Sequence, residues 1–399
     1  MSLNDTPSGE RLHIAFFGRR NAGKSSLVNA VTGQELSVVS DVKGTTTDPV
    51  YKAMELLPLG PVEIIDTPGF DDEGKLGELR VKKTRMILAK TDIAVLAADI
   101  TQGFGECEKE LTALFDERKI PYIIAYNKSD LCQNEIFSEK EITVSAKNGT
   151  NIHELKEKIT AIVKVNGEKR RIIGDMLNPE DLVVLVTPID AAAPKGRMIL
   201  PQVQTLRDIL DADGMAVFAK EFQLEAVLNG LAAPPKMVVT DSQAFGVVSR
   251  IVPENVPLTS FSILMARYKG FLETAVKGAA AVKNLKNGDK VLISEGCTHH
   301  RQCGDIGSVK LPKLLKKYTG AEPEIILSSG RDFPENLSEF NLVIHCGGCM
   351  LGEKEILYRK NSAEAQEVPF TNYGIVLAMF NGILKRSLGV FPELAALVD

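Results

Sequence analysis

Apolar runs of strand length alternate with stretches of helical spacing along most of the chain. This alternation predicts α/β architecture with largely parallel sheets. In the first third of the chain, the candidate strands are residues 13–18, 62–67, 93–100 and 121–128.

The same pattern continues in two further groups of elements. Residues 165–181 are polar and charged and contain a glycine and a proline, so we interpret them as the first linker. In the second group we expect strands at 181–190, 216–220 and 236–242 and helices at 199–213 and 222–231. In the third group we expect a helical stretch at 260–285, a helix at 311–320 and strands at 290–297, 324–330 and 341–349. We therefore predict three domains, at residues 1–168, 175–262 and 263–399.

Composition and charge indicate which classes of protein the chain could belong to. A chain of 399 residues is long enough for two or three domains with separate cores. The net charge of −5 does not suggest a nucleic-acid partner. No run of about eighteen apolar residues occurs, so no membrane span is expected. The N-terminal segment lacks the regions of a signal peptide, so we expect a cytoplasmic protein with reduced thiols.

The six cysteines are unevenly distributed. In a cytoplasmic chain they indicate metal ligands or free thiols rather than a disulfide framework. Cys107 and Cys132 stand alone in the first domain, and we interpret them as ordinary packing or surface thiols. The other four lie beyond residue 296, which concentrates the sulfur chemistry in the third domain.

Residues 18–25 read GRRNAGKS and fit the phosphate-loop pattern G-x-x-x-x-G-K-[ST] between a strand and a helix. Gly18 and Gly23 allow a tight loop whose N–H groups face phosphates, and the helix start adds a favourable dipole. Lys24 would reach the β- and γ-phosphates, and Ser25 would supply an oxygen to Mg²⁺. The other expected binding residues of this segment are Asn21, Ala22 and Ser26.

Four more segments have the order and spacing of a small GTP-binding domain. In DTPG at 66–69, Asp66 can hold Mg²⁺ through water and the Gly69 N–H can sense the γ-phosphate. In NKSD at 127–130, Asp130 can accept two hydrogen bonds from guanine that adenine does not offer, which predicts GTP rather than ATP. KGTTTDP at 43–49 can supply Thr46 to Mg²⁺, and SAK at 145–147 would cover the base. The further expected contacts are Thr45, Thr46, Asn127, Lys128, Ser145, Ala146 and Lys147.

Two details concern hydrolysis. Phe70 follows DTPG where Ras-like proteins have the glutamine that orients the attacking water, so slow hydrolysis or another device is expected. Asn21 and the sequence GTTTD resemble the TrmE–Era–EngA branch of GTPases, in which this asparagine helps to hold a potassium ion beside the phosphates. The alternative is that Asn21 only closes a turn. We expect Lys24, Asn21 and Thr46 to act in hydrolysis, with stimulation by K⁺.

Two cysteine motifs follow apolar strands near the C-terminus, CTH at 297–299 and HCGGC at 345–349. In a parallel sheet the loops that follow the strands open on one edge, so these two loops can meet. Three thiolates are the minimum for a 4Fe–4S cluster with one open iron, and three thiolates with one histidine suit zinc. The CxxC pair alone also fits a redox dithiol. The candidate ligands are Cys297, Cys346 and Cys349, with His299 and His345 as a fourth ligand or as hydrogen-bonding neighbours and Cys303 as a nearby free thiol.

A TrmE–Era-type GTPase followed by CxH and HCxxC resembles one family over essentially the whole chain: HydF, the scaffold of FeFe-hydrogenase maturation. The stretch at 188–211 looks like the start of the middle domain of that family. The resemblance implies three α/β domains: a Ras-like P-loop GTPase domain, a small dimerisation domain and an iron–sulfur cluster-binding domain.

The resemblance also implies a function. Cys297, Cys346 and Cys349 would hold a 4Fe–4S cluster, at which a transient two-iron subcluster precursor is built and carried. Two radical-SAM maturases would load this precursor, and the apo FeFe-hydrogenase would receive it. The chain would form a homodimer or a tetramer. GTP with Mg²⁺ would order the loops near 45–47 and 66–72, and hydrolysis would release them and time the handover.

Two other functions stay open. One is an RNA-directed GTPase of ribosome assembly or tRNA modification, with zinc held by Cys297, His299, Cys346 and Cys349. The acidic balance of the chain weakens it. The other is a redox enzyme that uses Cys346 and Cys349 as a dithiol. A brown protein after anaerobic reconstitution with iron and sulfide would favour the cluster over both.

Overall fold

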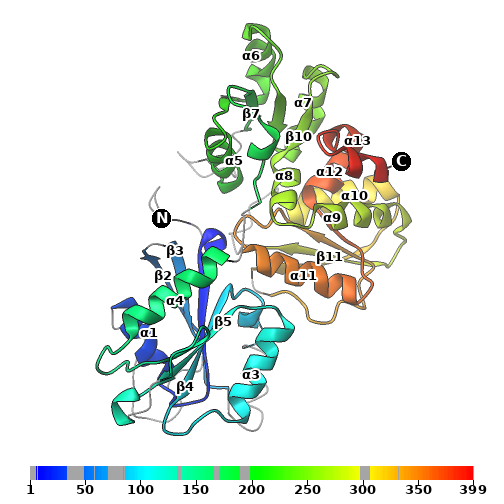
Figure 1. The fold of residues 1–399 in the computed structure, drawn as a ribbon. Helices are drawn as coiled ribbons and strands as arrows, with labels where there is room; N and C mark the ends of the chain where they lie inside the picture. Colours follow the sequence, from blue (N-terminus) through cyan, green and yellow to red (C-terminus); the bar gives the residue numbers. More distant parts are fainter. Residues whose placement is uncertain are drawn as a thin grey trace. The chain divides into compact units, whose positions relative to one another are not determined.

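The computed structural model describes most of the chain, and packing divides the chain into two compact units, Met1–Glu168 and Lys169–Asp399 (Figure 1). Each unit is described by itself below. The three domain boundaries expected from the sequence stay predictions. The described residues are 6, 8–33, 49–57, 59–70, 84, 86–132, 136–165, 170–188, 198–296, 306–330 and 332–398.

The N-terminal unit is built on one mixed sheet in the order β2-β3-β1-β4-β5-β6. Every described pairing in it is parallel except β2 with β3. The expectation of largely parallel strands is confirmed here, while the antiparallel edge strand β2 was not foreseen. The strands are β1 (Leu12–Phe17), β2 (Val50–Leu56), β3 (Gly60–Asp66), β4 (Ile93–Asp99), β5 (Tyr122–Asn127) and β6 (Glu141–Thr143).

Helices cover both faces of this sheet (Figure 1). On one face, α1 (Lys24–Thr32) and α4 (Ile152–Val165) pack against apolar side chains of β1, β3 and β4. On the other face, α3 (Glu106–Glu117) buries Leu111 and Phe115. Because β1, β3, β4 and β5 are parallel, their carboxyl ends lie at one edge, where ligands of such sheets bind. Short 3₁₀ turns lie at Ser8–Glu10 and Ser129–Leu131.

The C-terminal unit contains two four-stranded sheets, and all described pairings in both are parallel. The first has the order β10-β9-β7-β8 and the second β12-β11-β13-β14. The strands are β7 (Leu182–Val186), β8 (Met215–Ala219), β9 (Met237–Thr240), β10 (Leu258–Ser260), β11 (Lys290–Glu295), β12 (Glu324–Ser329), β13 (Leu342–His345) and β14 (Phe370–Asn372).

One hydrophobic core joins the two sheets of this unit, because it includes Val183 of β7, Leu292 of β11 and Leu264 of the helix α8 (Phe261–Tyr268). The α-helices are α5 (Leu200–Leu210), α6 (Leu224–Gly230), α7 (Phe245–Ile251), α8 (Phe261–Tyr268), α9 (Leu272–Ala279), α10 (Leu311–Thr319), α11 (Glu353–Ala365), α12 (Tyr373–Phe380), α13 (Leu384–Ser387) and α14 (Pro392–Ala395). The unit also has short 3₁₀ helices and one π-helix. The 3₁₀ helices are Gly174–Met176, Glu221–Gln223, Ser242–Ala244, Ala280–Asn284 and Ala396–Val398, and the π-helix is Ile306–Lys310.

The prediction of a single helical stretch at 260–285 is wrong in one respect. The chain breaks between α8 and α9 at Gly270, which has φ 77°. This left-handed conformation ends a right-handed helix and favours glycine. Apolar spacing continues on both sides of the break, so the pattern suggested one element where there are two.

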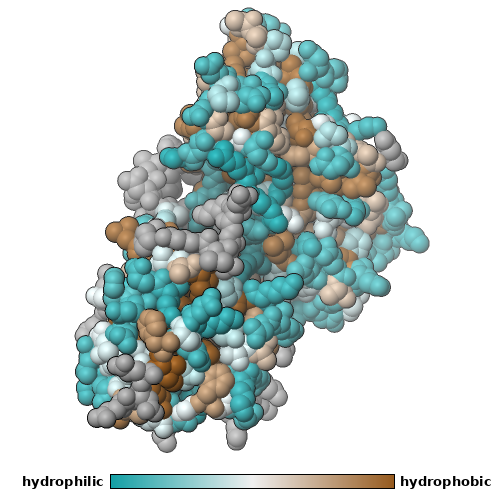
Figure 2. Space-filling model, viewed as in Figure 1, coloured by the Kyte–Doolittle hydropathy of each residue, from teal (hydrophilic) through white to brown (hydrophobic). Residues whose placement is uncertain are grey.

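The face shown in Figure 2 carries hydrophilic side chains over most of both units, with apolar side chains in smaller separate groups (Figure 2). In the described parts of the chain, no helix combines the length and the apolar character needed to cross a membrane.

His13, near the start of β1, lies buried between two carboxylates. Its Nε2 is 3.0 Å from Glu63 Oε2, and its Nδ1 is 3.5 Å from Asp92 Oδ2. Burial alone would lower the pKa of His13, but Asp92 and Glu63 outweigh it and raise the pKa to about 9. The charged ring therefore stabilises the fold fully below pH 6.5, the ordinary value, and this contribution is lost as the pH rises through 9.

We expect the His13→Gln variant to lose this pH dependence. The contribution of the charged ring is roughly 3 kcal/mol, from the size of the pKa change. Urea unfolding at a series of pH values between 6 and 10 measures it: the wild type should lose stability relative to the variant as the pH rises. Parallel stability curves for the two proteins would contradict this assignment.

Candidate nucleotide and sulfur sites

The phosphate loop connects β1 to α1 and depends on two glycines. At Gly18, with φ 143°, an added Cβ would lie 2.2 Å from the Ala97 carbonyl oxygen. At Gly23, with φ 82°, an added Cβ would lie 2.3 Å from Asn127 Nδ2. Any other residue would therefore push the loop away from β4 and β5. The next residue, Lys24, begins α1, so the helix N-terminus faces the loop.

Lys24 and Ser25 form the start of α1, directly after the phosphate loop. The buried Lys24 ammonium donates to the carbonyl oxygens of Gly18 (3.0 Å) and Arg19 (2.7 Å). Ser25 Oγ donates to Asp66 Oδ2 over 2.6 Å. The two oxygen ligands expected for Mg²⁺ thus come together from α1 and the end of β3, a hard-donor pair that suits this ion. Ser26 follows in the first turn of α1.

The segments expected to bind the base contact one another and the phosphate loop. Asn127, at the end of β5, donates from Nδ2 to Ala22 O (3.1 Å) and accepts from Ala146 N–H at Oδ1 (3.0 Å). Asp130 accepts a hydrogen bond from Ser145 Oγ over 2.7 Å. The structure therefore brings 127–130, 145–147 and the phosphate loop together at the carboxyl edge of the sheet. Gly69 also approaches this loop, because an added Cβ there would lie 3.0 Å from Arg20 N.

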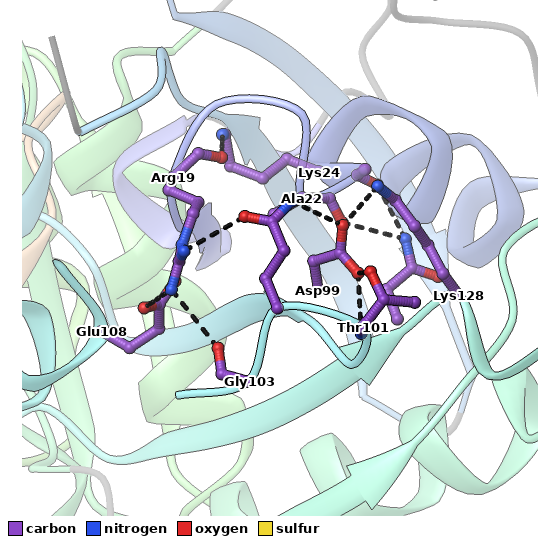
Figure 3. A network of polar contacts seen from close by, with 11 residues as sticks. Arg19, Ala22, Lys24, Asp99, Thr101, Gly103, Glu108 and Lys128 are labelled. Atoms are coloured by element: carbon purple, nitrogen blue, oxygen red, sulfur yellow. Dashed lines mark hydrogen bonds and ion pairs between the residues drawn. The ribbon is translucent and has the colours of Figure 1, made fainter. Parts of the chain in front are cut away.

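Two buried carboxylates at this edge were missed by the sequence reasoning (Figure 3). Asp99, at the end of β4, accepts from Lys128 Nζ over 2.6 Å. Glu108, in the first turn of α3, forms a two-pronged ion pair with Arg19 of the phosphate loop. The position of Asp99 at the end of a parallel strand could have indicated that it belongs to the site. Glu108 carried no such signal.

Several predicted site residues lie outside the described part of the chain. On the nucleotide side these are Thr45 and Thr46, and on the sulfur side they are Cys297, His299 and Cys303. Within the described residues, no group of three or more His, Cys, Asp or Glu side chains is placed to hold a metal ion.

The two sulfur motifs follow neighbouring strands, as expected. β11 and β13 pair in parallel, with Ser294 opposite His345. Cys346 N–H donates to Ser294 O over 2.9 Å. The loops that follow Gly296 and His345 therefore start at the same edge of the sheet.

Cys346 sits in an environment that fits a metal-bound thiolate. Its Sγ accepts hydrogen bonds from the N–H groups of Gly296 (3.1 Å) and Gly348 (3.4 Å). The residue is partly exposed, but its thiol is enclosed, and this burial raises the pKa of Cys346 to about 11. A thiol of this kind stays protonated until a metal displaces the proton. Backbone N–H groups directed at sulfur are typical of iron–sulfur sites.

His345 is fully buried and uses both ring nitrogens. Nδ1 lies 2.8 Å from Cys346 O, and Nε2 lies 3.2 Å from Arg359 Nη1. A carbonyl only accepts and a guanidinium only donates, so the proton is on Nδ1. Burial, followed by the charge of Arg359, lowers the pKa of His345 to about 3, which keeps the ring neutral. This arrangement fits a hydrogen-bonding neighbour of the cysteines rather than a direct ligand.

Arg359 of α11 holds the carboxyl ends of three strands, and sequence reasoning missed it. It donates to Gly330 O after β12 (2.6 Å) and to Ser294 Oγ at the end of β11 (3.4 Å), besides its contact with His345 of β13. Glu355, one turn earlier on α11, balances its charge over 2.7 Å. The buried guanidinium of Arg359 thus contacts the residue that precedes Cys346.

Two family models match the second half of the chain. The hydrogen maturase F dimerization domain matches residues 172–270, and the hydrogen maturase F tetramerization domain matches residues 273–390. The chain belongs to the hydrogen maturase F family. This confirms the resemblance to HydF. A third model, described as a 50S ribosome-binding GTPase, matches residues 13–128 of this hydrogen maturase F chain and confirms the GTPase-type fold of the first domain.

Curated relatives match the first domain of this hydrogen maturase F chain. GTPase Der of Wolinella succinogenes is 36% identical over 193 residues, which cover 44% of the chain and 40% of that protein. GTPase Der of Nautilia profundicola is 34% identical over 176 residues, 40% of the chain and 38% of that protein. The chain thus spans about two fifths of the length of these relatives.

Solved structures also match, but weakly. A crystal structure of Era in complex with MgGDPNP and nucleotides of 16S ribosomal RNA is 19% identical, with a TM-score of 0.34 over 52% of this chain and 91% of that one. A probable GTP-binding protein engB is 26% identical, with a TM-score of 0.31 over 39% of this chain and 99% of that one.

Proposed function

We propose that this chain is a GTP-hydrolysing scaffold that binds a 4Fe–4S cluster. In this proposal it holds a two-iron precursor of the FeFe-hydrogenase active site and transfers it to the apo-hydrogenase. Membership of the hydrogen maturase F family supports the proposal. The observation that carries it is the hydrogen bond from Gly296 N–H to Cys346 Sγ, because Cys297 is the next residue after Gly296. The last described residue before the first motif therefore contacts a cysteine of the second motif.

Cys297, Cys346 and Cys349 would hold the cluster, which when bound would supply an open iron position for the cargo. The N–H groups of Gly296 and Gly348 would stabilise the Cys346 thiolate. Both ring nitrogens of His345 already have partners, so this side chain would lie beside the cluster without binding it. The fourth ligand position of the cluster would be left to another group.

The nucleotide half of the proposal rests on the contacts at the sheet edge. Lys24 would neutralise the β- and γ-phosphates, and Ser25, Thr46 and Asp66 would hold Mg²⁺ directly or through water. Asp130 would select guanine. Ordering of the loops around Thr46 and Asp66 by GTP, and their release on hydrolysis, would change which partner binds.

The assembly and partners follow from the family. The names of the two matched domains support a homodimer or a tetramer. Two radical-SAM maturases and the apo FeFe-hydrogenase are the partners that we propose, with the exchange taking place in the cytoplasm, where thiols stay reduced.

Potassium is expected to accelerate hydrolysis. Asn21 has φ 60°, and from the phosphate loop its amide would help to hold K⁺, which neutralises charge as the γ-phosphate departs. We expect hydrolysis to be about tenfold faster in K⁺ than in Na⁺ at equal ionic strength, a fraction of the effect of an arginine finger. Asn21→Gly keeps the left-handed backbone but removes the amide, so it should lose this difference. Equal wild-type rates in the two buffers would remove the idea.

The cluster is tested by replacing each cysteine. After anaerobic reconstitution with iron and sulfide, the wild type should be brown, with a broad absorption band near roughly 400 nm. Iron content and the electron paramagnetic resonance signal should fall to background in Cys297→Ala, Cys346→Ala and Cys349→Ala, while Cys132→Ala stays like the wild type. A colourless protein that retains zinc would contradict the proposal and favour the RNA-directed GTPase with a zinc site.

A further inference from the structure

The connection between β4 and α3 carries two buried carboxylates, each bound to a cation from a different nucleotide-binding segment (Figure 3). Asp99 is 2% exposed and Glu108 is 0% exposed. A buried carboxylate is costly unless it is paired and hydrogen-bonded. The contacts of both groups therefore show what this part of the fold is built to hold.

Glu108 holds the phosphate loop. Its Oε1 accepts from Arg19 Nε over 2.7 Å, and its Oε2 accepts from Arg19 Nη2 and, over 2.9 Å, from Gly105 N–H. Arg19 Nη2 also reaches Gly103 O at 3.3 Å. Such a fork fixes both the position and the direction of the guanidinium. Burial would raise the pKa of Glu108, but Arg19 and the Gly105 N–H outweigh it and lower the pKa, which keeps the pair ionic.

Asp99 holds the base-binding segment. Lys128 Nζ donates to Asp99 Oδ2 over 2.6 Å, and Thr101 donates to Oδ1 from its N–H (3.0 Å) and its hydroxyl (2.7 Å). Lys128 has φ 67° and precedes the short turn that carries Asp130. The carboxylate thus anchors the residue from which the guanine-reading turn starts.

Gln102 lies between the two pairs. Its Oε1 accepts from Arg19 Nη1 over 3.2 Å, and its Nε2 donates to Asp99 Oδ2 over 3.1 Å. The amide is exposed, so water weakens these two bonds relative to the buried ones. The rigid parts of the arrangement are therefore the two carboxylates and the short chain between them.

We propose that residues 99–108 are a positioning element of the nucleotide site, in which Glu108 sets the phosphate loop through Arg19 and Asp99 sets the guanine-reading turn through Lys128. The inference rests on the proposed GTP binding and names what fixes the two halves of that site. Neither carboxylate acts on the nucleotide directly. Each acts through a cation, so its loss should affect one end of the ligand and spare the other.

Competition against a fluorescent GDP analogue, with GDP, GMP and IDP as probes, separates the two ends. The GDP:GMP affinity ratio reports the β-phosphate, and the GDP:IDP ratio reports the guanine amino group. Glu108→Gln should lower the GDP:GMP ratio about tenfold and leave the GDP:IDP ratio unchanged. Asp99→Asn should lower the GDP:IDP ratio about tenfold and leave the GDP:GMP ratio unchanged. A tenfold change is the size expected for a lost charge-assisted hydrogen bond. Glu110→Gln, at an exposed position of the same helix outside residues 99–108, is the control and should change neither ratio.

If Glu108→Gln does not fold, Arg19→Lys tests the same contact, because lysine keeps the charge but cannot form the fork. If Asp99→Asn does not fold, Thr101→Val should still lower the GDP:IDP ratio, by a smaller factor. Variants that melt earlier with both ratios unchanged, or that lower both ratios equally, would overturn the inference. A wild-type protein that binds none of the three probes would instead overturn the proposed function.

Discussion

Replacing Arg359 by methionine is expected to lower the free energy of unfolding of the C-terminal unit by about 3–5 kcal/mol, the cost of breaking a buried ion pair by removing one partner. Arg359 is 2% exposed, and methionine would fill much of its volume without its donors. The Glu355 carboxylate, the Gly330 carbonyl and His345 Nε2 would each lose the bond that the guanidinium makes. A buried polar group left without a partner costs more than the bond contributed.

Urea unfolding measures this effect, and the chain has no tryptophan, so far-UV circular dichroism is the suitable signal. Lys360→Met is the matched control. It removes an ion pair with the same spacing on the same helix, between Lys360 and the more exposed Glu364, and should cost no more than about 0.5 kcal/mol. Equal losses in the two variants would show that the contacts of Arg359 stabilise the unit no more than an exposed ion pair does.

The contiguous motifs of the nucleotide site could be predicted from the sequence, because each is short and has one backbone solution. Gly18 and Gly23 are required at their positions by the approach of β4 and β5, and the pattern encodes that requirement. The pairing of the two strands that precede the cysteine motifs could also be predicted, because parallel strands that end in polar motifs place those motifs at one edge. The contact between Ser25 and Asp66 follows from the same rule.

The residues that support these sites could not be predicted. Glu108 and Arg359 lie in helices whose spacing marks them as ordinary polar positions, and only the folded chain shows that they are buried. Their partners, Arg19 and His345, are distant in sequence or in another element. The helix break at Gly270 could not be predicted for a different reason. One glycine in a helical pattern is tolerated, and the periodicity of apolar residues does not encode its φ.

Replacing Lys24 by alanine is expected to lower the rate of GTP hydrolysis about 10²–10³-fold, the usual cost of losing one preorganised group that faces developing charge. Lys24 is buried, and its ammonium is held by the carbonyl oxygens of Gly18 and Arg19, so it is aimed before the nucleotide arrives.

The same variant tests whether the two halves of the chain bind their ligands independently. Lys24 belongs to the N-terminal unit, whereas Cys346 and Cys349 belong to the C-terminal unit. Phosphate release and iron content, measured on one anaerobic preparation, should therefore separate: hydrolysis falls and iron stays at the wild-type level. Lys109→Ala, at an exposed lysine of α3, is the control and should change neither value. Loss of iron in Lys24→Ala would contradict independent sites, because occupancy of the sulfur site would then depend on the phosphate loop.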